Sequence, residues 1–98
     1  MHYLLGLDIG TSGAKALVCD QQGQVLATAT AEYPLHSPQP LWSEQDPADW
    51  WRGAQDAIRA AIVKAGIDAR QIAGLGVTGQ MHGSVFLDEH DAVIRPAL

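Results

Sequence analysis

The chain is poor in cysteine and in positive charge. Cys19 is the only cysteine among 98 residues, which excludes a disulfide framework and a cysteine-ligated zinc site and is typical of a protein of the reducing cytoplasm. Six Lys and Arg stand against eleven Asp and Glu, and the net charge is -5. Because the basic residues are nowhere clustered, the sequence argues against binding to nucleic acid or to an anionic membrane surface.

Long apolar runs are also missing. The apolar stretch near the start is interrupted by Asp8 and has no basic region before it, so it matches neither a signal peptide nor a membrane span. With 98 residues, of which 47% are hydrophobic, the chain is expected to form one small cytoplasmic domain, without room for a second catalytic domain.

Short apolar segments are present instead, and they predict strands. The segments Tyr3 to Ile9, Ala14 to Asp20 and Gln24 to Tyr33 are separated by turn residues, which is typical of three consecutive antiparallel strands. In the second turn, Gly23 is placed where a positive φ is needed. The prolines between Pro34 and Gln45 then predict a loop.

A helix is expected after this loop. Asp46 is a favourable N-cap, Pro47 suits the first helical position, and Gly66 is placed to end the helix in the left-handed conformation. Apolar residues recur at helical spacing between these limits, which predicts a helix with one apolar face. Further strands are expected at Ile72 to Thr78, Ser84 to Leu87 and Val93 to Ile94.

Three strands, a helix and a strand in this order predict an α/β domain of the ribonuclease-H-like type, as in the actin-like ATPases, with a mixed sheet. A right-handed connection through the helix would return Ile72 to Thr78 beside the first strand and parallel to it. Since the carboxyl ends of such central strands face the ligand crevice, Asp8 and the segment Gly79 to Gly83 are expected at one rim of the sheet.

Asp8 and the turn after it predict a phosphate-binding hairpin. Gly10 and Gly13 allow backbone conformations closed to other residues and a close approach of phosphate to the amides, while Thr11 and Ser12 add hydroxyl donors. A carboxylate at the end of an apolar strand needs a cation or hydrogen-bond donors, and a hydrated Mg²⁺ would meet that need. On local pattern alone, the alternative is a tight hairpin in which Asp8 accepts hydrogen bonds from turn amides.

Three segments carry a resemblance to a known family. They are Leu7 to Lys15, with the sequence LDIGTSGAK, Leu41 to Trp51, which begins LWSEQDP, and Gly79 to Gly83, with the sequence GQMHG. In this order they resemble the beginning of the FGGY carbohydrate kinases, and among these the members that phosphorylate xylulose. The first segment is shared with other sugar kinases and with actin, whereas the other two are more specific. Because the family's kinases are several times longer and have two domains, the resemblance implies that residues 1–98 are the N-terminal part of the first domain.

The resemblance also implies roles for particular residues. Asp8 would help to hold the magnesium nucleotide, with water between the carboxylate and the metal, and Gly10 to Gly13 would form the first phosphate loop around ATP. Met81 and His82 would contact the ketose, with Gln80 nearby.

Two further parts of the family's site are expected outside this sequence. The general base, an Asp that takes the proton of the attacking hydroxyl, would lie beyond Leu98, and so would the adenosine-binding domain. The resemblance therefore implies that Asp8 and the turn after it supply only part of the catalytic site.

The function implied by the resemblance is ATP- and Mg²⁺-dependent phosphorylation of D-xylulose to D-xylulose 5-phosphate, with the 98 residues inactive by themselves. One alternative is another FGGY kinase, for ribulose, gluconate or glycerol, although the family's glycerol kinases typically have Arg and Glu at the positions of Met81 and His82. The other is a non-catalytic binding or interaction module with the same fold. Uncovered apolar surface and open sheet edges in so short a chain would favour a homodimer or other self-association.

Overall fold

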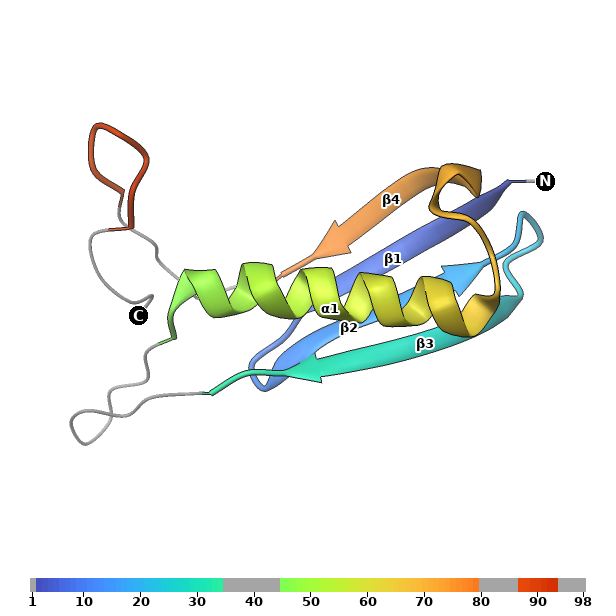
Figure 1. Cartoon of the computed structure of the whole chain (residues 1–98), viewed down its shortest axis with the longest axis horizontal. Helices are drawn as coiled ribbons and strands as arrows, with labels where there is room; N and C mark the ends of the chain where they lie inside the picture. The colour runs from blue at the N-terminus through green and yellow to red at the C-terminus, as the bar shows by residue number, and fades with distance from the viewer. Residues whose placement is uncertain (1, 35–44, 80–86, 94–98) are drawn as a thin grey trace.

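The computed structural model describes residues 2–34, 45–79 and 87–93, in which one α-helix lies against one face of a four-stranded sheet (Figure 1). The strands are β1 (Tyr3–Ile9), β2 (Gly13–Cys19), β3 (Val25–Glu32) and β4 (Ile72–Thr78). The connection from β3 to β4 contains α1 (Pro47–Ala65) and the short 3-10 helix η1 (Ala69–Gln71). Each strand agrees with its predicted segment to within one residue at either end.

The order of strands in the sheet is β3-β2-β1-β4. β2 pairs antiparallel with both β1 and β3, whereas β4 pairs parallel with β1. The predicted mixed sheet and the return of the last strand beside the first are therefore confirmed. Asp8 and Thr78 are partners in the β1–β4 register, so the carboxyl ends of these two strands meet at one rim, as expected.

The helix has the predicted limits because both of its end signals are local. The Asp46 side chain accepts a hydrogen bond from the Ala48 amide at 2.9 Å, and Pro47 occupies the first turn. At the other end, Gly66 adopts φ 70° and ψ 29° and closes the last turn with its amide. Within the described part of the chain, neither α1 nor any other helix is long and apolar enough to cross a membrane.

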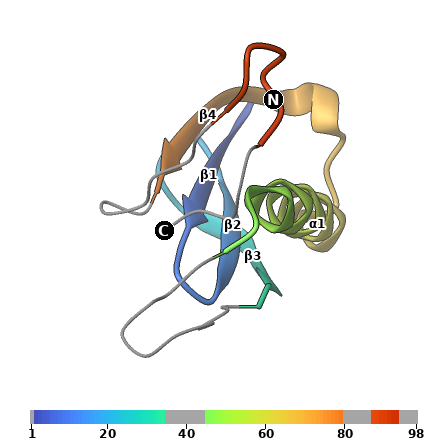
Figure 2. The same cartoon turned by 90° about the vertical axis from the view of Figure 1, so that its left-hand side faces the viewer.

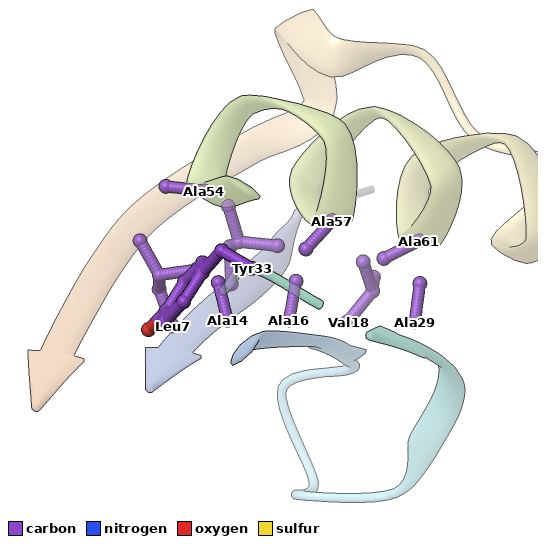
Figure 3. Close-up of a cluster of buried hydrophobic side chains, with 10 residues drawn as sticks. Leu7, Ala14, Ala16, Val18, Ala29, Tyr33, Ala54, Ala57 and Ala61 are labelled. Atoms are coloured by element: carbon purple, nitrogen blue, oxygen red, sulfur yellow. The ribbon is translucent and has the colours of Figure 1, made fainter. Parts of the chain in front are cut away.

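The core between helix and sheet consists mainly of alanine (Figure 3). The helix lies on one face of the sheet, mostly over β2 and β3, as Figure 2 shows. Its buried residues meet those of the sheet, namely Ala54, Ala57 and Ala61 from α1 and Ala14, Ala16, Val18 and Ala29 from the strands. Short side chains on both sides let the backbones approach closely, and there is little space for larger groups. Tyr33, just after β3, supplies the one aromatic ring of this buried cluster.

The same side of the sheet is less well covered at β4. Leu75 and Val77 are partners of the buried Leu5 and Leu7 in the β1–β4 register, yet they are 56% and 59% exposed. Trp51 on α1 is exposed as well. An exposed apolar surface of this kind favours association, and self-association of the chain stays a prediction.

The predicted strands Ser84 to Leu87 and Val93 to Ile94 lie mostly outside the described residues. Their described ends, Leu87 and Val93, form an isolated antiparallel bridge. Between them the Asp88 carboxylate accepts hydrogen bonds from the amides of His90 and Ala92. This acidic segment is therefore organised as an exposed turn.

Gly53 of α1 provides a test of the packing. At an exposed helical position, Gly is about 1 kcal/mol less favourable than Ala. At Gly53 the added Cβ would lie 2.9 Å from Cδ2 of Tyr33, whose hydroxyl is held by the Gly10 carbonyl. We therefore expect Gly53→Ala to lower the free energy of unfolding by about 1–2 kcal/mol, measured by urea denaturation of the 98-residue chain.

The matched control is Ala60→Gly, at an exposed position of the same helix. It measures helix propensity without a change in packing and is expected to cost about 1 kcal/mol. A Gly53→Ala variant more stable than the unmodified chain would show that the Tyr33 ring has room to move and that the packing is not the limiting constraint.

Candidate functional site

Asp8 is held at the rim of the sheet by the neighbouring parallel strand. Its side chain is exposed, and Thr78 Oγ1 donates a hydrogen bond to Asp8 Oδ1 at 2.7 Å. Within the described residues the donor belongs to β4. The alternative interpretation of the sequence, a tight hairpin, predicted donors from the amides of the turn. The Thr78 hydroxyl thus fixes the orientation of a carboxylate that remains open to solvent.

A hollow beside Asp8 brings two opposite charges together on the face of the sheet away from α1. The cavity has a volume of about 250 Å³, and its lining includes Asp8, Lys15 and Thr78. Asp8 and Lys15 are partners in the β1–β2 register, so their side chains lie on the same face. Gly6 and Gly76, which are also partners across two strands, leave space in the floor. The hollow therefore offers one carboxylate and one ammonium group at the edge of a lining that also contains Leu7 and Leu17.

The two glycines of the β1–β2 turn lie where space is short and do not have an unusual backbone conformation. In the described residues the glycines with positive φ are Gly23, as predicted, and Gly66. A Cβ on Gly13 would lie 2.6 Å from the Ala31 carbonyl oxygen, and one on Gly10 would lie 3.2 Å from the Gly13 oxygen. The expectation that Gly10 and Gly13 adopt conformations closed to other residues is wrong, because neither has a positive φ. Lack of space excludes a side chain at Gly13 and makes one at Gly10 tight.

Three consecutive carbonyl groups of the turn accept hydrogen bonds from the protein. The Tyr33 hydroxyl donates to the Gly10 oxygen, Gln45 Nε2 donates to the Thr11 oxygen at 2.6 Å, and the Tyr33 amide donates to the Ser12 oxygen at 3.2 Å. In a planar trans peptide the C=O and the following N–H point in opposite directions. The amides of Thr11 and Ser12 therefore point away from Tyr33 and Gln45, on residues that are themselves exposed.

This arrangement places donors where an anion can reach them. Successive outward-pointing amides form a concave anion site, and the exposed Thr11 and Ser12 side chains add two hydroxyl groups. The predicted phosphate-binding residues Asp8, Thr11 and Ser12 thus lie at one end of the sheet, with Gly10 and Gly13 shaping the turn.

Tyr33 and Gln45 belong to this site although sequence reasoning assigned them no role. Gln45 is 3% exposed and also accepts a hydrogen bond from Trp50 Nε1 at 3.0 Å. The sequence contained one signal, a polar residue directly before the helix cap. Its partner on the turn, however, is 34 residues away along the chain.

The surroundings of Tyr33 favour the protonated form of its hydroxyl, which can donate a hydrogen bond. Burial raises the pKa of the Tyr33 hydroxyl, and the negative charge of Asp8 raises it further. The hydroxyl therefore remains protonated over a wider pH range than a free tyrosine and can donate to the Gly10 carbonyl throughout it.

The predicted sugar-binding residues Gln80, Met81 and His82 lie outside the described residues. The chain enters their segment from the rim, because Thr78 contacts Asp8 and is followed by one further described residue. That the segment belongs to the site stays a prediction.

The predicted general base does not belong to the described residues either. It is expected beyond Leu98, and Leu98 itself lies outside the described part of the chain, which ends at Val93. Among the described residues, Asp8 is therefore the carboxylate assigned to the site, and its predicted task is to support the metal and not to accept the proton. The position of the base stays a prediction.

Comparison with known proteins gives one matching family. The model of the FGGY family of carbohydrate kinases, N-terminal domain, matches residues 3–98. A xylulose kinase of Klebsiella pneumoniae is 45% identical over 94 residues, which are 96% of this chain and 19% of that protein. A glycerol kinase of Ralstonia nicotianae is 45% identical over 85 residues, which are 87% of this chain and 17% of that protein.

A solved structure described as a xyloylose kinase from Brucella ovis superimposes with a TM-score of 0.94 at 43% identity. The match covers 99% of this chain and 20% of that structure. The chain thus spans about a fifth of the length of the relatives it matches, and the ribonuclease-H-like fold expected from the order of elements is confirmed.

Removal of the Tyr33 hydroxyl tests its contact with the turn. Since the pKa of Tyr33 is raised by folding, its contribution to stability is complete below about pH 10 and is lost as the pH rises through the folded pKa. We expect Tyr33→Phe to lower the free energy of unfolding by about 1 kcal/mol at neutral pH and to reduce the loss of stability above about pH 10.

Urea denaturation at neutral and alkaline pH measures both effects. Tyr3→Phe, on the same sheet but at the other end of β1, is the control and is expected to retain the alkaline loss. An unchanged alkaline slope in Tyr33→Phe would mean that Tyr33 does not cause it.

Proposed function

This chain belongs to the FGGY family of carbohydrate kinases, and we propose that the full-length protein transfers the γ-phosphate of ATP to D-xylulose and yields D-xylulose 5-phosphate. The observation that supports this most is the β1–β2 turn, which directs amides and hydroxyls outward beside the exposed Asp8 carboxylate. The choice of D-xylulose rests on the sequence GQMHG after β4 and on the similarity to xylulose kinases.

The described residues fit a magnesium nucleotide. Mg²⁺ retains several waters and is commonly bound by one or two carboxylates together with substrate phosphates, which suits the single exposed carboxylate of Asp8. Thr11 and Ser12 offer amide and hydroxyl donors for phosphate oxygens, and Lys15 adds a positive charge at the same rim. When bound, the magnesium nucleotide would supply the phosphoryl group and offset its negative charge.

Each residue of the proposed site then contributes to positioning or to charge neutralisation. Phosphoryl transfer depends mainly on positioning and on neutralisation of charge. The turn orients the phosphates, and Thr78 fixes the Asp8 carboxylate. Gln80, Met81 and His82 bind the ketose, for which a histidine ring can both donate and accept hydrogen bonds. The proton of the attacking hydroxyl passes to a carboxylate in the remainder of the full-length protein.

Phosphorylation of glycerol is the second candidate. The glycerol kinase relative is as similar to this part of the protein as the xylulose kinase relative is. Sequence identity in this region therefore does not distinguish a kinase for xylulose from one for glycerol. The distinction depends on the residues that contact the substrate.

A coupled ATPase assay on the full-length protein tests the proposal with D-xylulose, D-ribulose, gluconate and glycerol. We expect D-xylulose to give the highest kcat/KM and Asp8→Asn to lower kcat about 100-fold, the upper range for loss of a group that supports a metal. Asp20→Asn is the matched control, because Asp20 is a turn carboxylate at the opposite end of the sheet. Stimulation by glycerol without stimulation by D-xylulose would refute the substrate, and no stimulation by any of them would favour a non-catalytic module.

The 98-residue chain by itself is expected to show no sugar-dependent turnover. On the proposed function, the proton acceptor and the adenosine-binding domain belong to the remainder of the protein, beyond Leu98. The same coupled assay, with the full-length protein as positive control, measures this. Sugar-dependent ATP hydrolysis by the isolated chain would contradict the assignment of the base to a later segment.

A further inference from the structure

Gln45 connects the phosphate turn to the first turn of α1, and we propose that it is a positioning residue which sets the direction of the Ser12 amide and thereby the affinity for the nucleotide phosphates. The proposal rests on the function proposed above. It concerns a residue that lies on the inner side of the turn and does not touch the ligand.

The amide of Gln45 is suited to both of its contacts. An indole N–H can only donate and a backbone carbonyl can only accept. Gln45 accepts from Trp50 Nε1 through its oxygen and donates to the Thr11 carbonyl through its nitrogen. An ionised Glu lacks the donor, a Lys lacks the acceptor, and an apolar side chain lacks both. The contacts therefore specify an amide, and they also fix which end of it faces the turn.

A polar side chain that is as buried as Gln45 requires an explanation. Gln45 is 3% exposed, and a buried polar group costs free energy that its hydrogen bonds do little more than recover. An apolar side chain of similar size would fill the same space but would leave the Trp50 indole N–H and the Thr11 carbonyl without this partner, which also costs free energy. The polar side chain is therefore explained by the two groups that it holds.

The group that Gln45 holds is the central peptide of the turn. In the four residues Gly10 to Gly13, the peptide between Thr11 and Ser12 lies between the second and third positions. The two commonest turn types differ in the direction of this peptide. With the Thr11 carbonyl fixed at 2.6 Å from Gln45 Nε2, the Ser12 N–H points to the opposite side, where phosphate would bind.

Tyr33 fixes the preceding peptide in the same way. Its hydroxyl holds the Gly10 carbonyl, which directs the Thr11 N–H outward. Tyr33, just after β3, and Gln45, just before α1, therefore act on adjacent peptides of the turn. Because the Tyr33 ring is also part of the core, Gln45 is the better residue for a test of positioning alone.

The test uses the full-length protein and the variants Gln45→Met and Gln45→Glu. Gln45→Met removes both hydrogen bonds at similar length, and Gln45→Glu in its ionised form retains the acceptor for Trp50 but loses the donor to Thr11. We expect either variant to raise the KM for MgATP about tenfold, the ratio for loss of one well-placed hydrogen bond. The KM for the sugar is expected to stay within about twofold of wild type, because the sugar contacts are not altered.

Two controls separate positioning from stability. Ala57→Gly weakens the buried contact between helix and sheet and is expected to lower Tm without changing either KM. Trp50→Phe removes the indole donor to Gln45 but leaves the donor to Thr11, so it is expected to raise the KM for MgATP less than Gln45→Met does.

The outcomes are distinguishable. If wild type shows no sugar-dependent ATP turnover, the proposed function fails. If wild type is active but Gln45→Met and Gln45→Glu lower Tm and leave the KM for MgATP unchanged, Gln45 is only structural and this inference is wrong. An equal rise in the KM for MgATP and in the KM for the sugar would also overturn it. So would the same rise in the KM for MgATP in Ala57→Gly. Should Gln45→Met fail to fold, the isosteric Gln45→Glu decides by the same criteria.

Discussion

The close contact of α1 with β2 and β3 is the constraint on which the arrangement of the site depends. Alanine on both surfaces, such as Ala57 from the helix and Ala16 from the sheet, brings the two backbones near each other. Gly53 then has no room for a side chain, because the Tyr33 ring fills the space. A larger residue in place of any of these would push the helix outward and move Gln45 away from the turn.

The β1–β2 turn has two sides with different partners. Its carbonyls face the protein and accept hydrogen bonds from Tyr33 and Gln45, so the amides of the following residues face outward. The Asp8 carboxylate is also held by the protein, since Thr78 donates a hydrogen bond to one of its oxygens. Groups directed before the ligand arrives do not have to be ordered when it binds, and this lowers the cost of binding.

Local signals in the sequence were sufficient for the elements of the fold. Asp46 and Gly66 mark the helix ends through contacts within a few residues, and the meeting of Asp8 with β4 follows from the parallel return of the last strand. The hydrogen bonds of Tyr33 and Gln45 to the turn join residues 23 and 34 positions apart. They depend on how closely the helix approaches the sheet, and no local pattern contains that distance.

The glycines of the two hairpin turns show a second limit of prediction from sequence. A glycine can be required by a positive φ or by lack of space, and the residue type is the same in both cases. Gly23 belongs to the first kind. Gly13 belongs to the second, since a Cβ would meet the Ala31 carbonyl. Only the fold, through the pairing of β2 with β3, distinguishes the two.

The pairing of β1 with β4 also determines how the two halves of the proposed site lie relative to each other. Thr78 holds Asp8, and one residue later the chain enters the segment that holds Gln80 to His82. The proposed phosphate-binding end and the residue before the proposed sugar-binding segment are thus held by one pair of hydrogen-bonded strands. Displacement of reacting atoms by about 1 Å can reduce a rate about 100-fold. Two paired strands therefore hold the distance between the phosphate turn and the segment after Thr78 better than a loop would. Differences in sugar preference among such kinases can then arise after Thr78 without disturbing the phosphate turn.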